Sequence, residues 1–198
     1  LFKILELKNF YKIIYNDVLL SIFKIIFPEL KNIYRLKNYT LIKNFLKKNE
    51  MLLLSILLMD ETNDYEYFFH KYKISNKIKD NLIILNKGFK DFKSNKDFFK
   101  KDIKNNLYKY NLNNIEILYV LNILDKKKIT KLDLNYLKEL PRISIPKFPY
   151  DGKFLINRGL KEGKNLGVIL REVEKHWLGN DFYITNKELE TIVNKYAK

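Results

Sequence analysis

The chain of 198 residues carries 38 Lys and Arg against 23 Asp and Glu, a net charge of +15, and no Cys. An apolar fraction of 46% excludes intrinsic disorder, and the lack of Cys excludes a disulfide scaffold or a Cys-based zinc site. The longest apolar run, Met51 to Met59, is half as long as a bilayer requires. The sequence therefore predicts no membrane span, no secretory signal and a cytoplasmic location.

The positive charge favours a nucleic-acid partner but does not by itself establish one. Lys and Arg that neutralise phosphates release counterions and give sequence-independent affinity. Of the 38 cations, 34 are Lys, and Asn, Ile, Tyr and Phe abound, as an AT-rich coding sequence would produce regardless of function. Arg is more informative because its planar fork suits phosphate, and three of the four Arg lie between Arg142 and Arg171.

The chain up to residue 140 predicts an all-α body of short antiparallel helices, because apolar residues recur at spacings of three and four with almost no Gly or Pro. Leu1 already lies within such a pattern, so we expect the chain to be a fragment. Asp17 is expected to cap a helix, and Pro28 to begin the next. The apolar side of the helix after Asp17 is expected to hold Val18, Leu19, Ile22, Phe23 and Ile26.

Further helices are expected before residue 140. The run 51–59 is apolar nearly all round and should be the central buried helix. Ser75 should cap a helix over 76–86, and another should cover 115–124. The last helix of the body should begin at Thr130, with an acidic residue three positions later that completes a capping box.

Eight Lys lie from Lys87 to Lys109, interleaved with Phe. Two interpretations stay open for this segment: an amphipathic element with a solvated cationic face, which we favour, and a stripe that contacts RNA. His70 and His176 lie far apart with no partner at ligand spacing, so no metal site is expected. The acidic residues of 60–64 are expected to form a solvated loop without a catalytic role.

The composition changes near Pro141, since five of the six Gly and three of the four Pro follow residue 140. This change predicts two domains, a helical body over 1–140 and a helical tail over 141–198. In the tail, Asp151 should cap a short helix that ends at Gly159, and a second helix should run from about Asn165 to residue 178. A capping box at 185–188 should begin the last helix.

The two tail helices predict a hairpin whose turn offers backbone N–H groups to a phosphate. Gly163 and Gly167 carry no side chains that would block the approach, and the helix dipole adds positive charge at the second helix start. The alternative is structural: Gly159 ends a helix, Gly163 supplies a turn and Gly167 permits close helix packing. Trp177 lies on the apolar stripe of the second helix and is expected to anchor the core.

The tail also carries one long pattern of spaced residues. It reads Phe148-Pro149-x-x-Gly152-x-x-Leu155, then Gly159-Leu160-x-x-Gly163-x-x-Leu166-Gly167-x-Ile169-Leu170-Arg171-x-Val173-Glu174-x-x-Trp177. This pattern resembles the C-terminal signature of bacterial tRNA nucleotidyltransferases, the CCA-adding members of the poly(A) polymerase family. Upstream, Leu19-Leu20-x-x-Phe23-x-x-Ile26-Phe27-Pro28-Glu29-Leu30 resembles helices that follow the family's neck, and Ile74-Ser75-Asn76 resembles a helix start in its body.

The resemblance implies an enzyme whose catalytic part lies outside this chain. In this family an N-terminal head binds two Mg²⁺ through paired aspartates, and a neck selects CTP and then ATP. None of these motifs occurs here, so no catalytic residue is carried over. Mg²⁺ and CTP or ATP are implied only for the head, the head and neck are implied partners, and these 198 residues alone are expected to be inactive.

What remains resembles the part that holds the acceptor stem and T arm of tRNA during 3′-end processing. An A-form helix is held mainly through phosphates and 2′-hydroxyls. The expected RNA contacts are Lys153, Arg158, Lys161, Gly163, Lys164, Asn165, Gly167, Arg171 and Lys175. The alternative is a free-standing helical module that binds RNA or protein without enzymatic activity. Whether the parent adds CCA, only A, only C or poly(A) depends on residues outside this sequence, and the oligomeric state stays open.

Overall fold

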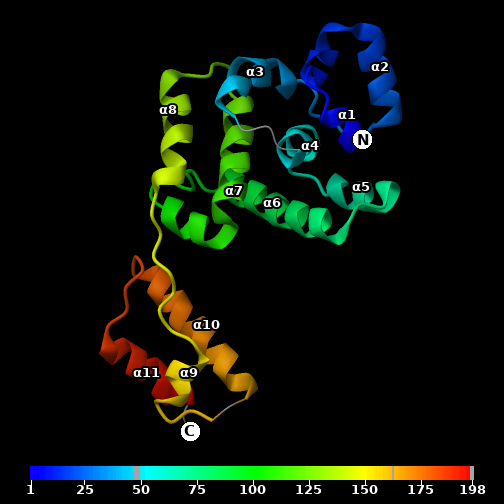
Figure 1. The fold of residues 1–198 in the computed structure, drawn as a ribbon. Coiled ribbons are helices and arrows are strands. Elements are labelled where there is room, and N and C mark those ends of the chain that lie inside the picture. Colours follow the sequence, from blue (N-terminus) through cyan, green and yellow to red (C-terminus); the bar gives the residue numbers. More distant parts are fainter. Residues whose placement is uncertain (47–49, 162, 197–198) are drawn as a thin grey trace. The chain divides into compact units, whose positions relative to one another are not determined.

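The computed structural model describes residues 1–46, 50–161 and 163–196, with the side chains of Glu50 and Lys164 excepted. Within these ranges the chain is all-α and contains no strand, which confirms the predicted fold class (Figure 1). The chain divides into two compact units, Leu1–Ser144 and Ile145–Lys198. The division lies four residues after the predicted domain boundary at residue 140.

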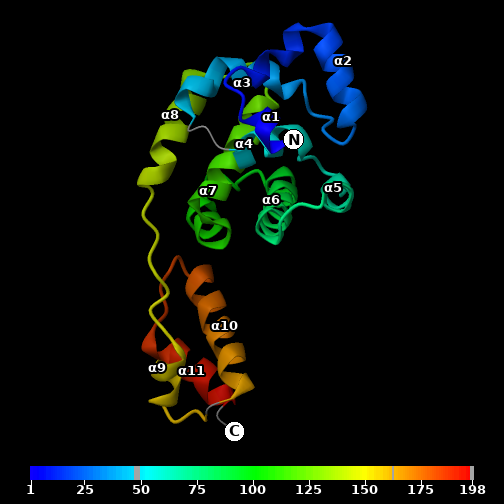
Figure 2. The ribbon, with the colours of Figure 1, turned by 45° about the vertical axis from the view of Figure 1, so that its right-hand side comes forward.

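The first unit is built around one apolar helix, α4 (Glu50–Leu58). Its residues from Leu52 onward, and Met59 after it, are buried, and α1, α3 and α7 pack against it (Figure 2). The prediction of a central buried helix over 51–59 is thus confirmed. The elements of this unit are α1 (Phe2–Leu5), η1 (Phe10–Tyr15), α2 (Asp17–Ile26), α3 (Arg35–Ile42), η2 (Lys43–Phe45), α4, α5 (Asp64–Tyr72), α6 (Asn76–Ser94), α7 (Ile103–Leu124), α8 (Lys131–Glu139) and η3 (Leu140–Arg142).

Helix α2 differs from its prediction in its cap and in the side it buries. The Asn16 side chain, one residue before Asp17, accepts the capping hydrogen bond from the Leu19 N–H at 3.0 Å. Of the five apolar residues expected on the inner side, Phe23 alone is buried. The reason is aromatic packing, because the Phe23 ring lies between those of Phe10 and Phe27 at centroid distances of 5.5 and 5.0 Å.

The expected helix start at Pro28 is wrong, since the next helix, α3, begins at Arg35. Side chains hold the intervening segment in turns. The Glu29 carboxylate accepts hydrogen bonds from Lys71 and Tyr72 at 2.6 and 2.9 Å, and the Asn32 amide donates to two carbonyls at the end of α4. These contacts supplement the backbone hydrogen bonds of the turns, such as the one from the Arg35 N–H to the Asn32 carbonyl at 3.1 Å.

Helices α6 and α7 are both longer than predicted. Phe89, Phe92 and Phe98 are buried, whereas the Lys residues of 87–104 are exposed, as the amphipathic interpretation predicts. Helix α7 is kinked at Asn111, where φ is 61° and ψ 165°. The Asn111 side chain accepts a hydrogen bond from the Asn114 N–H, so it acts as a new N-cap for the second half of the helix.

Replacing Gly88 with Ala is expected to lower the free energy of unfolding of the first unit by about 1–2 kcal/mol, despite the higher helix propensity of Ala. A Cβ at Gly88 of α6 would lie 2.5 Å from Cδ1 of Leu118, which is fully buried on α7. Gly167→Ala is the matched control, because a Cβ there meets nothing within 4 Å, and it should stabilise by about 0.5–1 kcal/mol. Urea unfolding followed by circular dichroism measures both, and a gain in both variants would contradict the close contact at Gly88.

The second unit contains α9 (Gly152–Ile156), α10 (Lys164–Gly179) and α11 (Asn186–Tyr196), and α10 contacts both of the others. Ile169, Val173 and Trp177 of α10 are buried, as the apolar stripe predicts. Two predicted caps are also confirmed: the box of Thr185 and Glu188 begins α11, and in the first unit Thr130 and Asp133 begin α8.

Candidate nucleic-acid interface

The turn between α9 and α10 begins at a defined helix end. Asp151 caps α9 as predicted, since its carboxylate accepts a hydrogen bond from the Phe154 N–H at 2.8 Å. After α9, Gly159 adopts a φ of 87°, and the Leu160 N–H reaches back to the Leu155 carbonyl at 3.3 Å. This pair of features is the Schellman helix ending, in which Gly is favoured because side chains disfavour positive φ.

Arg158 lies at this helix end, and its side chain is exposed but held in place by a neighbouring ring. Its guanidinium carbon lies 4.0 Å from the centre of the Phe154 ring, in cation–π contact. The ring covers one face of the guanidinium and leaves the N–H groups at its edge available to a phosphate. Sequence reasoning missed the role of Phe154, although its spacing of four residues from Arg158 is the signal of such a pair.

Among the described residues, no side chain caps the start of helix α10. Gly163 precedes its first turn with a φ of 152°, offers no side-chain acceptor, and no acidic residue lies within the first turn. The backbone N–H groups of a helix start carry the positive end of the helix dipole, which favours an anion. The start of α10 is therefore electrostatically suited to a phosphate.

A cationic face runs along α10 from this start. Gly167, Arg171 and Lys175 recur at four-residue spacing and are exposed, on the side of the helix opposite the buried stripe that ends at Trp177. The Arg171 side chain extends toward the helix start, where its Nε donates a hydrogen bond to the Gly167 carbonyl at 3.0 Å. The charge of Arg171 is thereby directed to the same end of α10 as the open first turn.

The structure leaves the predicted RNA-binding residues at the surface. The side chain of Lys164 lies outside the described residues. One alternative for the glycines is wrong, because no atom of the described residues lies within 4 Å of a Cβ built at Gly167 and close packing against another described helix does not require this residue. The exposed predicted positions are Lys153, Arg158, Lys161, Gly163, Asn165, Gly167, Arg171 and Lys175.

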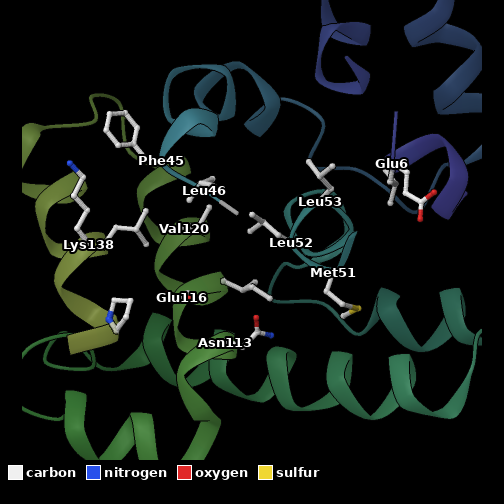
Figure 3. Close-up of a pocket in the computed structure, with 14 residues that line it drawn as sticks. Glu6, Phe45, Leu46, Met51, Leu52, Leu53, Asn113, Glu116, Val120 and Lys138 are labelled. Atoms are coloured by element: carbon white, nitrogen blue, oxygen red, sulfur yellow. The ribbon is translucent and has the colours of Figure 1, made fainter. Parts of the chain in front are cut away.

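A hollow of about 780 Å³ in the first unit has a different chemical character (Figure 3). Among the described residues, most of the lining is apolar, and the charged ones are two carboxylates, Glu6 and Glu116, and one amine, Lys138. Carboxylates repel phosphate, so these described groups do not form a phosphate site. The lining residues are Leu5, Glu6, Phe45, Leu46, Met51, Leu52, Leu53, Asn113, Glu116, Ile117, Val120, Leu137, Lys138 and Pro141.

The perturbed carboxylates of the first unit are engaged in ion pairs. Burial raises the pKa of Glu29, but hydrogen bonds from Lys71 and Tyr72 outweigh it and leave the pKa below its ordinary value. Burial acts in the same way on the pKa of Asp133, where the hydrogen bond from Lys126 is the largest lowering influence. These pairs join structural elements and account for the shifts without a catalytic role.

The described residues offer no metal site. Within residues 1–46, 50–161 and 163–196, no group of three or more His, Asp or Glu lies close enough together to hold a metal ion. No helix in these ranges has the length and apolar character needed to cross a membrane.

Comparisons of the chain with protein-family models, with curated proteins and with solved structures found no match.

Proposed function

We propose that this chain is the tRNA-holding part of a CCA-adding tRNA nucleotidyltransferase and that the second unit grips the phosphates of the acceptor stem and T arm. The proposal rests on the exposed cationic face of α10, which leads from Lys175 through Arg171 to the uncapped first turn after Gly163. The motif from Phe148 to Trp177, which resembles the C-terminal signature of that family, supports it independently.

This arrangement suits double-stranded RNA better than single-stranded RNA. An A-form stem is recognised through phosphates and 2′-hydroxyls, for which fixed guanidinium groups and backbone N–H groups are suitable donors. Single-stranded RNA is instead held largely by aromatic rings on which bases stack. Trp177 is buried and Arg158 covers one face of the Phe154 ring, so the tail offers a base little ring surface beside its cations.

Charge reversal of Arg158 and Arg171 together is expected to weaken binding of a tRNA acceptor and T-arm minihelix by roughly 100-fold, because each change removes a charged hydrogen bond worth about 1.5 kcal/mol. The slope of log affinity against log salt should fall by about two. Lys187→Glu with Lys195→Glu, the same charge change at exposed positions of α11, is the matched control and should retain most of the affinity.

The unmodified chain should prefer the minihelix to single-stranded RNA of equal length near physiological salt. Equal and wholly salt-labile binding to both RNAs would mean that the net charge of +15 acts without a specific site. Unchanged minihelix affinity in the Arg158 and Arg171 double variant, with an unchanged circular dichroism spectrum, would remove α10 from the binding surface.

A further inference from the structure

The outer side of α2 is an apolar surface that no other described element covers. Val18, Ile22 and Ile25 are 69%, 47% and 79% exposed, and Leu19 and Ile26 beside them are each 52% exposed. Figures 1 and 2 both show α2 at the rim of the first unit. Single exposed apolar residues are common on proteins, but five on one ten-residue helix are typical of an interaction surface.

The packing of the inner side of α2 determines which side of the helix faces outward. Phe23 is buried against Phe10 and Phe27 against Phe23, and the side chain of Asn16 caps the first turn. Because aromatic rings already occupy the inner side, α2 cannot rotate to bury its outer residues without exposing those rings. The apolar surface is therefore a stable feature of the folded first unit.

The charges on α2 are complementary to a second copy of the same helix. Asp17 and Lys24 lie seven residues apart, two helical turns, and so flank the apolar surface along one edge. Neither makes a hydrogen bond or ion pair within the described part of the chain. An antiparallel copy of α2 would place the Asp17 of each chain beside the Lys24 of the other, whereas in a parallel two-fold pair the charged edges of the two helices would lie on opposite sides of the contact.

We propose that α2 is a self-association surface on which a second copy of this chain docks through its own α2, antiparallel and about a two-fold axis near Ile22. In this arrangement Val18 packs against Ile25 of the second copy, and Ile22 packs against its own symmetry mate. Two ion pairs between Asp17 and Lys24 then close one edge of the contact. The proposal concerns the first unit and is independent of RNA binding by the second.

The contact is small, because it involves about five side chains from each copy. Stable dimers bury roughly 800 Å² from each partner, so we expect a weak dimer with a Kd of roughly 10–100 µM. Sedimentation equilibrium of the 198-residue chain from about 5 to about 500 µM spans this range. A chain that stays monomeric throughout would overturn the proposal and show that something other than a second copy covers α2.

Ile22→Glu should raise the dimer Kd by roughly tenfold or more, because it places two carboxylates against each other at the two-fold axis. The circular dichroism spectrum should not change, since Ile22 is half exposed in the single chain. Leu132→Glu is the matched control: Leu132 is 78% exposed on α8, and its replacement should leave the Kd unchanged. A dimer that survives Ile22→Glu would exclude α2 as its contact.

A charge exchange tests the antiparallel arrangement itself. Asp17→Lys and Lys24→Asp should each weaken the dimer by severalfold, because each places like charges side by side. The double exchange should restore the Kd to within about threefold of the unmodified chain, since both ion pairs return with their signs reversed. Failure to restore it would contradict the antiparallel pairing. An unchanged minihelix affinity of the Ile22→Glu variant would separate this result from the RNA-binding proposal.

Discussion

Arg35→Met is expected to lower the free energy of unfolding of the first unit by about 3–5 kcal/mol, because it breaks a buried ion pair and removes the hydrogen bonds that its guanidinium donates. The Arg35 side chain is 2% exposed. Its Nε and Nη2 donate to the two carboxylate oxygens of Asp125 at 2.7 and 3.1 Å. Its Nη1 donates to the carbonyls of Ile56 and Met59 at 3.1 and 2.6 Å.

The size of this effect follows from the number of elements that meet at one guanidinium. Arg35 belongs to α3, the two carbonyls lie at the end of α4, and Asp125 follows α7 directly. Lys93 of α6 also pairs with Asp125, at 3.1 Å. Urea unfolding followed by far-ultraviolet circular dichroism measures the change.

Arg142→Met is the matched control for Arg35→Met. Arg142 makes an exposed ion pair with Glu139 at 2.8 Å, and surface pairs contribute about 0–1 kcal/mol. Similar stability losses in the two Arg variants would show that the network around Arg35 does not hold the unit together.

The same network gives the stability a dependence on pH. Burial raises the pKa of Asp125, but hydrogen bonds from Arg35 and Lys93 outweigh it and hold the pKa below the ordinary value of 3.8. The stabilisation is therefore complete above pH 3.8 and is lost as the pH falls through the lower pKa of the folded protein. In Arg35→Met the loss of stability on acidification should be smaller, because the main influence that lowers this pKa is gone.

Trp177→Ala is expected to destabilise the second unit by about 3–5 kcal/mol, the range for deletion of a large buried side chain. Trp177 is 2% exposed, and its ring contacts those of Phe148 and Phe182 at centroid distances of 5.4 and 4.9 Å. Phe182 has a φ of 66°, which bulky residues rarely adopt, and its contact with Trp177 helps to hold it there. The substitution therefore removes both a core anchor and the support of a strained turn.

Trp177→Phe is the conservative control and should cost less than the Ala variant, because a ring still fills most of the space. Thermal unfolding followed by circular dichroism compares the two. An unchanged melting temperature in Trp177→Ala would mean that the indole lies outside the core, open to a base of bound RNA.

Local signals in the sequence predicted the helix boundaries most accurately where a cap or an apolar stripe was present. The boxes at Thr130 and Thr185, the cap at Asp151 and the Gly159 ending were all identified correctly. Each depends on hydrogen bonds between residues within five positions of one another, so the signal is contained in a short stretch of sequence. The buried helix at 51–59 was equally clear, because a helix that is apolar all round has no solvent side.

The sequence could not predict which side of α2 is buried or why Arg35 is internal. Apolar residues cover most of the circumference of α2 outside the stripe of Asp17, Ser21 and Lys24, so periodicity alone does not choose which of them are buried. The choice came from the ring contacts of Phe23 with Phe10. Arg35 became internal because Asp125, 90 residues away, supplies a carboxylate at the place where α3 and α4 meet. For the candidate site, the sequence identified the exposed cations of the tail, but not the Phe154 ring beneath Arg158.

The sequence by itself thus determined the all-α class, most helix ends and the apolar stripe of α10, because these depend on short-range hydrogen bonds and on the helical period. Tertiary structure alone decided the turns of 28–34, the close contact of α6 with α7 at Gly88 and the exposed apolar side of α2. These features depend on groups far apart in the chain that compete for the same space and the same hydrogen-bond partners. Which groups contact one another is therefore decided only in the folded protein.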